Sequence, residues 1–314
     1  MTRVLVTGSA GFTGRHFRAR LAERADVTAL WTARTAEDGL EALELTDAEA
    51  VDAAVAAFRP DCVVHLAAQA SLVRADQSPA SSWRSNVDAT INLALAVARH
   101  VPESRFVFAS TAQVYGRVFL QEAPVDETSP IAPEGVYPHT KAAAEMALRD
   151  MLPATVETVV LRSFNQIGAE QERAYVTATF AAQVAEAEAG LRGTAIRVGN
   201  LAAVRDFLDV RDFVRLLDTV ATGPRKAAGY RIYNVGSGNP VSIGSILERL
   251  RAMSTVALTV DVDPALFRPI DVPYTAGAFE AVRKDYDWCT SISLERSLED
   301  ILAHWRRTVG TRVR

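Results

Sequence analysis

Short apolar runs alternate with amphipathic stretches through the first half of the chain. The runs have apolar or β-favouring residues at nearly every position, which is typical of strands that are buried on both faces. Between them, apolar residues recur at helical spacing. This alternation predicts a parallel sheet covered by helices on both sides. The expected strands are 4–7, 27–31, 62–67, 105–109 and 156–161, and the expected helices include 15–21, 48–58 and 86–101.

After about residue 165 the pattern loosens. We predict a doubly wound parallel sheet, Rossmann-like, with a smaller C-terminal lobe interleaved with it. Ligands of such sheets bind at the carboxyl edge, where this lobe is expected to lie. Helical stretches are expected at 177–190, 213–221, 242–253 and 294–308, with one strand at 230–236. The expected division is 1–165 and 206–236 for a dinucleotide-binding domain, and 166–205 and 237–314 for a substrate lobe.

Composition and charge argue against nucleic-acid-binding, membrane-spanning and disulfide-rich proteins, but they do not indicate a reaction. Of 314 residues, 49% are hydrophobic, and the net charge is −4 with no basic stripe of the kind that binds nucleic acid. No apolar run reaches the roughly 18 residues of a membrane-spanning helix. Cys62 and Cys289 are the only cysteines, so no disulfide framework and a cytoplasmic location are expected. The chain begins directly with a strand, so we expect no signal peptide.

The turn after the first strand is the strongest chemical signal. Gly8, Gly11 and Gly14 follow the strand at three-residue spacing, and a helix is expected directly behind them. Glycines let the backbone approach an anion, and a helix N-terminus offers free N–H groups to it. The arrangement predicts a pyrophosphate-binding turn for a dinucleotide. Because the spacing differs from GxGxxG, the alternative is a glycine-rich turn that binds nothing.

Two further features could carry out acid–base chemistry. Tyr137 and Lys141 are one helical turn apart, so they share a helix face. An ammonium beside a phenol favours the phenolate and lowers the phenol pKa from its usual value near about 10. Ser110 and Thr111 end a predicted strand, where a hydroxyl could bind a substrate carbonyl. Each feature alone also fits an ordinary helix pair or strand end.

Several segments taken together resemble one known family. The extended short-chain dehydrogenase/reductases that act on nucleotide sugars share, in this order, segments that here are TGSAGFTGRH, HLAAQAS, NVDATINL, FASTAQVYG and YPHTK. In the C-terminal half, the similarity is greatest to GDP-4-keto-6-deoxy-mannose reductases, in the segments LRSFNQIG, VGNLAAVRDFLDVRD, YNVGSGNPVSI and DPALFRPIDV. The resemblance covers nearly the whole chain.

The resemblance implies roles for individual residues. Thr111 would hold the substrate carbonyl, Tyr137 would donate the proton, and Lys141 would bind the nicotinamide ribose and lower the Tyr137 pKa. Asn86 matches a structural asparagine near the active site. Besides Tyr137 and Lys141, the residues expected to bind the cofactor are Gly8, Gly11, Phe12, Thr13, Gly14, Arg34, Asp47, Leu66, Ala67, Ala68 and Gln69. Besides Thr111, those expected to bind the substrate are Ser71, Asn165, Arg205, Arg268 and Asp271.

The residue type at the end of the second predicted strand helps to distinguish a site for NAD(H) from a site for NADP(H). A carboxylate there would bind the ribose 2′-hydroxyl of NAD(H) and repel a 2′-phosphate. This chain instead has Arg34, which could pair with a 2′-phosphate, the alternative being a solvated loop residue. We therefore expect NADP(H) as the cofactor, with NAD(H) as a second candidate.

The resemblance implies NAD(P)H-dependent reduction of the 4-keto group of a 4-keto-6-deoxy nucleotide sugar. Dehydratases of the family carry acidic residues directly after the catalytic Ser/Thr, where this chain has Ala112 and Gln113. The alternatives left open are a 4-epimerase or dehydratase, a dTDP-4-keto-6-deoxyhexose reductase, and a cofactor-binding sensor or scaffold. The family often dimerises through helices around 90–100 and 138–150, so a homodimer is expected. No metal is expected, and His65 is interpreted as a core residue.

Overall fold

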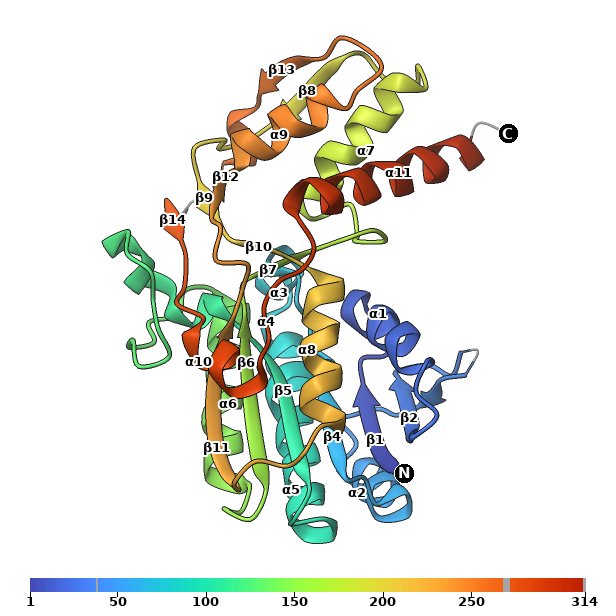
Figure 1. The fold of residues 1–314 in the computed structure, drawn as a ribbon, viewed down its shortest axis with the longest axis vertical. Helices are drawn as coiled ribbons and strands as arrows, with labels where there is room; N and C mark the ends of the chain where they lie inside the picture. The colour runs from blue at the N-terminus through green and yellow to red at the C-terminus, as the bar shows by residue number, and fades with distance from the viewer. Residues whose placement is uncertain (38, 268–271, 313–314) are drawn as a thin grey trace.

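A parallel β-sheet forms the centre of the molecule (Figure 1). The computed structural model describes residues 1–37, 39–267 and 272–312. Its seven-stranded sheet has the order β11-β6-β5-β4-β1-β2-β3, and every pair in it is parallel. The predicted doubly wound parallel sheet is therefore confirmed. Its strands are β1 (Thr2–Thr7), β2 (Val27–Ala33), β3 (Glu41–Ala42), β4 (Cys62–His65), β5 (Arg105–Thr111), β6 (Glu157–Ser163) and β11 (Gly229–Val235).

Different helices cover the two faces of the sheet. Val63 and Val64 on β4 are fully buried in two different cores, because neighbouring strand residues point to opposite faces. Burial on both sides explains why this strand is apolar at successive positions. The core around Val63 includes α2 (Ala48–Phe58), α5 (Ala89–His100) and α6 (Val136–Met151), and the core around Val64 includes α1 (Phe12–Leu21) and α8 (Val210–Thr222).

Short helical segments connect the sheet to its covering helices. The helix expected at 86–101 is preceded by one π-helical turn, in which Asn86 is buried. Gly116 interrupts the 3₁₀ segment after β5 with a positive φ of +46°. These segments are α3 (Leu72–Gln77), α4 (Pro79–Trp83), the π-helical turn η1 (Arg84–Asp88), the 3₁₀ segment η2 (Ala112–Gln121) and α10 (Glu280–Tyr286).

A second, smaller lobe lies beyond the carboxyl ends of the strands, at the top of Figure 1. Its helices α7 (Val176–Glu188), α9 (Ile243–Ala252) and α11 (Leu294–Arg312) share one apolar core. No helix in the described ranges is both long enough and apolar enough to span a membrane. Short strands complete this lobe and its junction with the sheet: β7 (Asn165–Ile167), β8 (Ala195–Val198), β9 (Val204–Arg205), β10 (Phe207–Asp209), β12 (Val241–Ser242), β13 (Thr259–Val262) and β14 (Tyr274–Thr275), with the 3₁₀ turn η3 (Pro264–Leu266).

The stretch around α10 packs on the sheet although it follows the second lobe in sequence. Phe279, Val282 and Trp288 lie in the core shared with α8. The Trp288 indole N–H donates a hydrogen bond of 3.0 Å to the backbone oxygen of Asp212 on α8. The chain therefore returns to the sheet at α10 and crosses back to the second lobe at α11, which makes two crossings more than the expected boundary at residue 237 implies. That division into domains stays a prediction.

Candidate functional site

Close backbone contacts shape the glycine turn after β1. Gly8 has a φ of +75°, and a Cβ atom there would lie 2.6 Å from the backbone nitrogen of Ala67. At Gly14 a Cβ atom would lie 2.3 Å from the backbone oxygen of Gly8. Gly11 begins α1 with no side chain to cap it, so the first N–H groups of that helix can bind an anion. The turn therefore fits a pyrophosphate, which needs both the close approach and the donors.

A cavity of about 250 Å³ lies beside this turn, at the ends of β1, β2 and β4. This is the edge at which parallel sheets of this kind bind dinucleotides. The predicted cofactor residues that line it are Gly8, Gly11, Arg34, Leu66, Ala67, Ala68 and Gln69. The sequence analysis did not single out its other lining residues, which are Ala10, Thr32, Ala33, Leu43, Glu44, Leu45, Thr46, Ser85 and Ala89.

Phe12 and Thr13 contact the junction with the second lobe through their side chains. The Thr13 hydroxyl donates a hydrogen bond of 2.8 Å to Oε1 of Gln166 on β7. The Phe12 ring lies 3.3 Å from the position that a Cβ atom would take at Gly168. Their backbone belongs to the start of α1, so these two residues connect the glycine turn to the segment that enters the second lobe.

The polar end of the cavity contains Arg34. The Arg34 side chain is exposed, while hydrogen bonds from Thr46 and the charge of Arg34 lower the pKa of the Glu44 carboxyl. Asp47 instead caps α2, where its carboxylate accepts two backbone N–H groups at 3.1 Å each. Thr46 lines the cavity directly before Asp47, and the expected role of Asp47 in binding the cofactor stays a prediction.

Thr111, Tyr137 and Lys141 meet at the end of β5 and the start of α6. All three are buried. The Thr111 hydroxyl forms a hydrogen bond with the Tyr137 phenol. The Lys141 ammonium lies 3.9 Å from the centroid of the Phe108 ring, a distance at which a cation interacts with an aromatic face. Sequence alone could not decide whether these residues met; the fold brings them together.

Burial controls the protonation of this group. It raises the pKa of the Tyr137 phenol; an ionised Tyr175 adds to the shift, and the Thr111 hydrogen bond opposes it. Burial also lowers the pKa of Lys141 to about 7, while the Glu145 carboxylate acts in the opposite direction. Without a ligand, burial thus outweighs the pKa-lowering effect expected of Lys141 on Tyr137, and the phenol is protonated at neutral pH.

Asn86 connects the cavity to α6. Its Oδ1 accepts the backbone N–H of Gln69 at 2.7 Å, and its Nδ2 donates to the Thr140 hydroxyl at 2.9 Å. Thr140 lies between Tyr137 and Lys141 on α6, so the structural role implied for this asparagine has a geometric basis. Across the described residues, no three His, Cys, Asp or Glu side chains are grouped so that they could hold a metal ion.

Asn165 and Arg205, two of the residues expected to bind the sugar nucleotide, lie at the junction of the lobes. The Asn165 amide on β7 donates to the backbone oxygen of Asp206 at 3.3 Å. Arg205 on β9 is half-buried and donates to the carbonyl that precedes it at 2.8 Å. The buried Asp206 carboxylate accepts backbone N–H groups from residues 237 and 238 at 2.7 Å each, which fixes the loop after β11. Arg268 and Asp271 lie outside the described residues.

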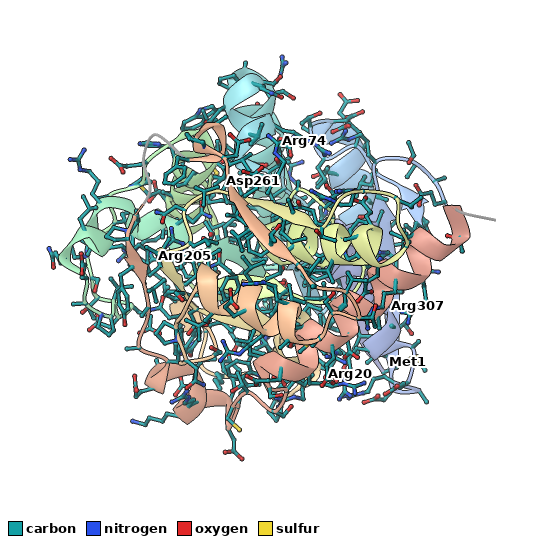
Figure 2. The ribbon with its side chains drawn as sticks, turned by 90° about the horizontal axis from the view of Figure 1, so that it is seen from above. Met1, Arg20, Arg74, Arg205, Asp261 and Arg307 are labelled. Carbon is teal, nitrogen blue, oxygen red and sulfur yellow. The ribbon has the colours of Figure 1, made fainter. Side chains whose placement is uncertain are left out.

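Tyr175 is a site residue that the sequence analysis missed. It precedes α7, and an ionised Tyr175 raises the pKa of the Tyr137 phenol, so Tyr175 acts electrostatically on the site. Arg74 on α3 forms an ion pair of 3.6 Å with Glu172 of the second lobe, and Ser71 caps α3 by accepting the Arg74 N–H at 3.4 Å. Figure 2 shows where Arg74 and Arg205 lie in the view from above. Tyr175 belongs to no motif, because only the packing of the second lobe brings it near Tyr137.

Comparisons with known proteins agree with this geometry. A sequence profile of the NAD dependent epimerase/dehydratase family matches residues 4–236. GDP-6-deoxy-D-mannose reductase of Pseudomonas aeruginosa is 31% identical over 98% of this chain and 98% of its own. RMD from Pseudomonas aeruginosa, solved in complex with NADPH, has a TM-score of 0.86 at 27% identity, over 98% of this chain and 100% of the other. UDP-glucose 4-epimerase of Thermotoga maritima, solved with UDP-glucose, has a TM-score of 0.85 at 25% identity, over 98% and 100%. The chain belongs to the NAD dependent epimerase/dehydratase family.

Proposed function

We propose that this chain is an NADPH-dependent reductase of the 4-keto group of a 4-keto-6-deoxy nucleotide sugar, of the type that converts GDP-4-keto-6-deoxy-mannose to GDP-rhamnose. The observation that carries the proposal is the buried meeting of Thr111, Tyr137 and Lys141 beside the glycine turn. The full-length similarity to GDP-6-deoxy-D-mannose reductase supports the substrate class.

The three residues would stabilise charge and supply one proton. A bound nicotinamide would supply a hydride to the ketone carbon. Negative charge then develops on the carbonyl oxygen, where hydrogen bonds from Thr111 and Tyr137 would stabilise it. Because burial raises the pKa of Tyr137, the phenol holds the proton that this oxygen must receive. Lys141 would bind the ribose, and its positive charge would stabilise the phenolate left behind.

NADPH is the cofactor that we propose first, with NADH as the second candidate. Arg34 is an exposed cation at the cavity beside the glycine turn, where a 2′-phosphate of the adenosine ribose would need one. The similar RMD from Pseudomonas aeruginosa was solved with NADPH, which supports the same choice.

A 4-epimerase is the second candidate function, because the fold is also similar to UDP-glucose 4-epimerase of Thermotoga maritima. Both reactions use a tyrosine and a lysine beside a nicotinamide. They differ in electron balance: a reductase consumes one reduced cofactor for each ketone, whereas an epimerase returns the hydride to the sugar and consumes none.

The deciding experiment follows the nicotinamide absorbance of the purified chain mixed with NADPH and GDP-4-keto-6-deoxy-mannose. We expect stoichiometric loss of NADPH and a GDP-6-deoxyhexose with an alcohol at carbon 4, identified by NMR. The dTDP-linked ketone, run in parallel, reports the nucleobase preference. No loss of NADPH with either ketone, together with interconversion of UDP-glucose and UDP-galactose, would replace the reductase with the epimerase.

We further propose that the enzyme is a homodimer in the cytoplasm. Leu95 on α5 and Met146 on α6 expose 49% and 56% of their surface, although these two helices pack on each other. A second copy of the same face would bury both side chains. Light scattering during gel filtration should give the mass of a dimer for the wild-type chain and of a monomer for Leu95→Glu.

The proposed cytoplasmic location is supported by the cysteines, because free thiols at Cys62 and Cys289 fit a reducing compartment.

A further inference from the structure

A buried ion pair lies one helical turn beyond Lys141. The Arg162 guanidinium on β6 binds the Glu145 carboxylate on α6, with 2.7 Å between Nη2 and Oε2 and 3.2 Å from Nε to each oxygen. The Ser110 hydroxyl donates to Oε1 of the same carboxylate. All three side chains are buried. The pair therefore lies in the interior, where a charge acts on its neighbours with little screening.

The Arg162 guanidinium also packs against an aromatic ring. The Arg162 guanidinium lies 4.9 Å from the centroid of the Tyr115 ring. The Tyr115 hydroxyl donates to Asn234 on β11 at 2.7 Å, which fixes that ring. Glu145 follows Lys141 by four residues along α6, so the two side chains share a helix face. The charge of Glu145 acts on the Lys141 ammonium.

The face of the Phe108 ring stabilises the Lys141 ammonium, but the titratable groups around Lys141 that follow add no compensating negative charge. His65 on β4 is neutral at physiological pH because burial lowers its pKa to about 3. Tyr137, on the same helix, and Tyr115 of η2 both have a pKa raised by burial. On β11, the Tyr230 hydroxyl donates to the backbone oxygen of Glu145 at 3.1 Å. On the segments that cover α6 from outside, the charged side chains of Arg74, Asp76, Arg84 and Asp88 are exposed.

We propose that Glu145 is a positioning residue that keeps Lys141 protonated, and that Arg162 and Ser110 hold the Glu145 carboxylate in place for this purpose. The proposal rests on the proposed function, in which Lys141 binds the nicotinamide ribose as an ammonium. Burial favours the neutral amine, and a carboxylate one turn away restores the charged form. Glu145 thereby sets the upper pH limit of cofactor binding without touching cofactor or substrate.

The test measures the dissociation constant of NADPH by its fluorescence between neutral and alkaline pH. In the wild-type chain the affinity should fall as Lys141 loses its proton. Glu145→Gln keeps the size of the side chain and one of its two acceptor oxygens, but it removes the charge and leaves Arg162 uncompensated. We expect the pH at which affinity falls to decrease by roughly one unit. Adding Arg162→Met to Glu145→Gln removes that uncompensated cation and should reverse part of the decrease.

Glu157→Gln is the matched control. Glu157 is a fully buried carboxylate at the start of β6, at the end of the sheet away from Lys141. It pairs with Arg105 at 2.8 Å. This variant should also lower the free energy of unfolding, but it should leave the pH dependence of NADPH affinity unchanged. A purely structural role for Glu145 predicts that Glu145→Gln behaves like Glu157→Gln, and that result would overturn the proposal.

Two further outcomes are informative. If Glu145→Gln does not fold, Arg162→Met alone decides, because the buried Glu145 carboxyl then loses the cation that keeps it charged and in place. The pH at which affinity falls should then decrease, and an unchanged or higher pH would overturn the proposal. If the wild-type chain binds NADPH with this pH dependence but reduces no 4-keto sugar, the proposed function fails while the role of Glu145 stands.

Discussion

Nδ1 of His65 lies 2.7 Å from the hydroxyl of Thr7, in the buried sheet directly behind the glycine turn. On the other side of the ring, Nε2 lies 3.0 Å from the Thr90 hydroxyl, which donates its own hydrogen to the backbone oxygen of Asn86 at 2.6 Å. Thr90 therefore accepts from Nε2–H, and Nδ1 accepts from Thr7. Both ring nitrogens are satisfied in the neutral form, as expected of a core histidine.

This arrangement makes the stability of the fold sensitive to acid. Burial lowers the pKa of His65 from 6.5 to about 3. Below pH 6.5 the unfolded chain takes up a proton that the folded chain does not, so the free energy of unfolding falls as pH falls, by about 1.4 kcal/mol per pH unit.

His65→Gln isolates this contribution. Urea unfolding at several pH values from neutral to about 5 should show a lower free energy of unfolding for the variant at neutral pH, because hydrogen bonds are lost. The variant should also lose stability less steeply with falling pH than the wild type, by about 1.4 kcal/mol per unit. If the free energies of unfolding of the two proteins change in parallel with pH, the pKa of His65 is the same in the folded and the unfolded chain, and the prediction is wrong.

Tyr137→Phe should abolish most of the reaction while preserving the cofactor site. The substitution keeps the ring and removes the proton donor, so turnover should fall by a factor on the order of 10² or more. The dissociation constant of NADPH should change little, because the glycine turn is untouched. Both are measured with one preparation, by single-turnover kinetics and by fluorescence titration.

Tyr175→Phe serves as the control for this prediction. Tyr175 acts electrostatically on Tyr137, but it precedes α7, whereas Thr111 bonds to Tyr137 and Lys141 shares the helix of Tyr137. It should retain most of the wild-type rate. Near-normal reduction by Tyr137→Phe, or a larger loss in Tyr175→Phe, would assign the acid to the other tyrosine.

Local patterns predicted the elements and the glycine turn, because strand, turn and helix each leave a signal within a few residues. Gly8 illustrates this: its positive φ and its contact with Ala67 both follow from one position in the turn. The assembly of Thr111 with Tyr137 and Lys141 was also foreseen, but only through the family resemblance. Spacing alone did not distinguish this set from an ordinary strand end and helix pair.

The contacts that escaped prediction join segments that are far apart in the chain. Tyr175 approaches Tyr137 because the second lobe folds over the sheet edge, and Glu145 meets Arg162 because α6 packs across β6. The return of α10 to the first core depends on Trp288 docking against α8. No hydrophobic periodicity or sequence motif marks the residues that make these contacts, so the contacts can be seen only in the tertiary fold.

Arg34 should determine the preference for NADPH over NADH. Arg34→Ala removes the cation from the cavity, and a lost charge-assisted hydrogen bond should weaken NADPH binding about tenfold. NADH lacks the 2′-phosphate, so its affinity should stay the same. Arg99→Ala, an exposed arginine on α5 that pairs with Asp52, is the control and should change neither constant. A wild-type preference for NADH would contradict the role given to Arg34.

The positions after Thr111 exclude one reaction that relatives of this family perform. Elimination of water across carbons 5 and 6 of the sugar requires one group to remove a proton and another to protonate the departing hydroxyl. Here Ala112 is buried, and Gln113 is half-buried with its backbone N–H 3.2 Å from the Thr111 hydroxyl. The alanine side chain has no ionisable proton and an amide does not titrate near neutral pH, so neither position can serve as acid or base.

The wild-type enzyme should therefore yield no 4-keto-6-deoxy product from GDP-mannose or dTDP-glucose, even with oxidised cofactor and long incubation. The same preparation should reduce the 4-keto-6-deoxy nucleotide sugar, because ketone reduction needs only Thr111, Tyr137 and Lys141. Mass spectrometry reports the loss of water in the first assay, and nicotinamide absorbance reports the second, so an inactive preparation is recognised at once. Elimination by the wild-type chain would refute the interpretation of Gln113 and identify a dehydratase.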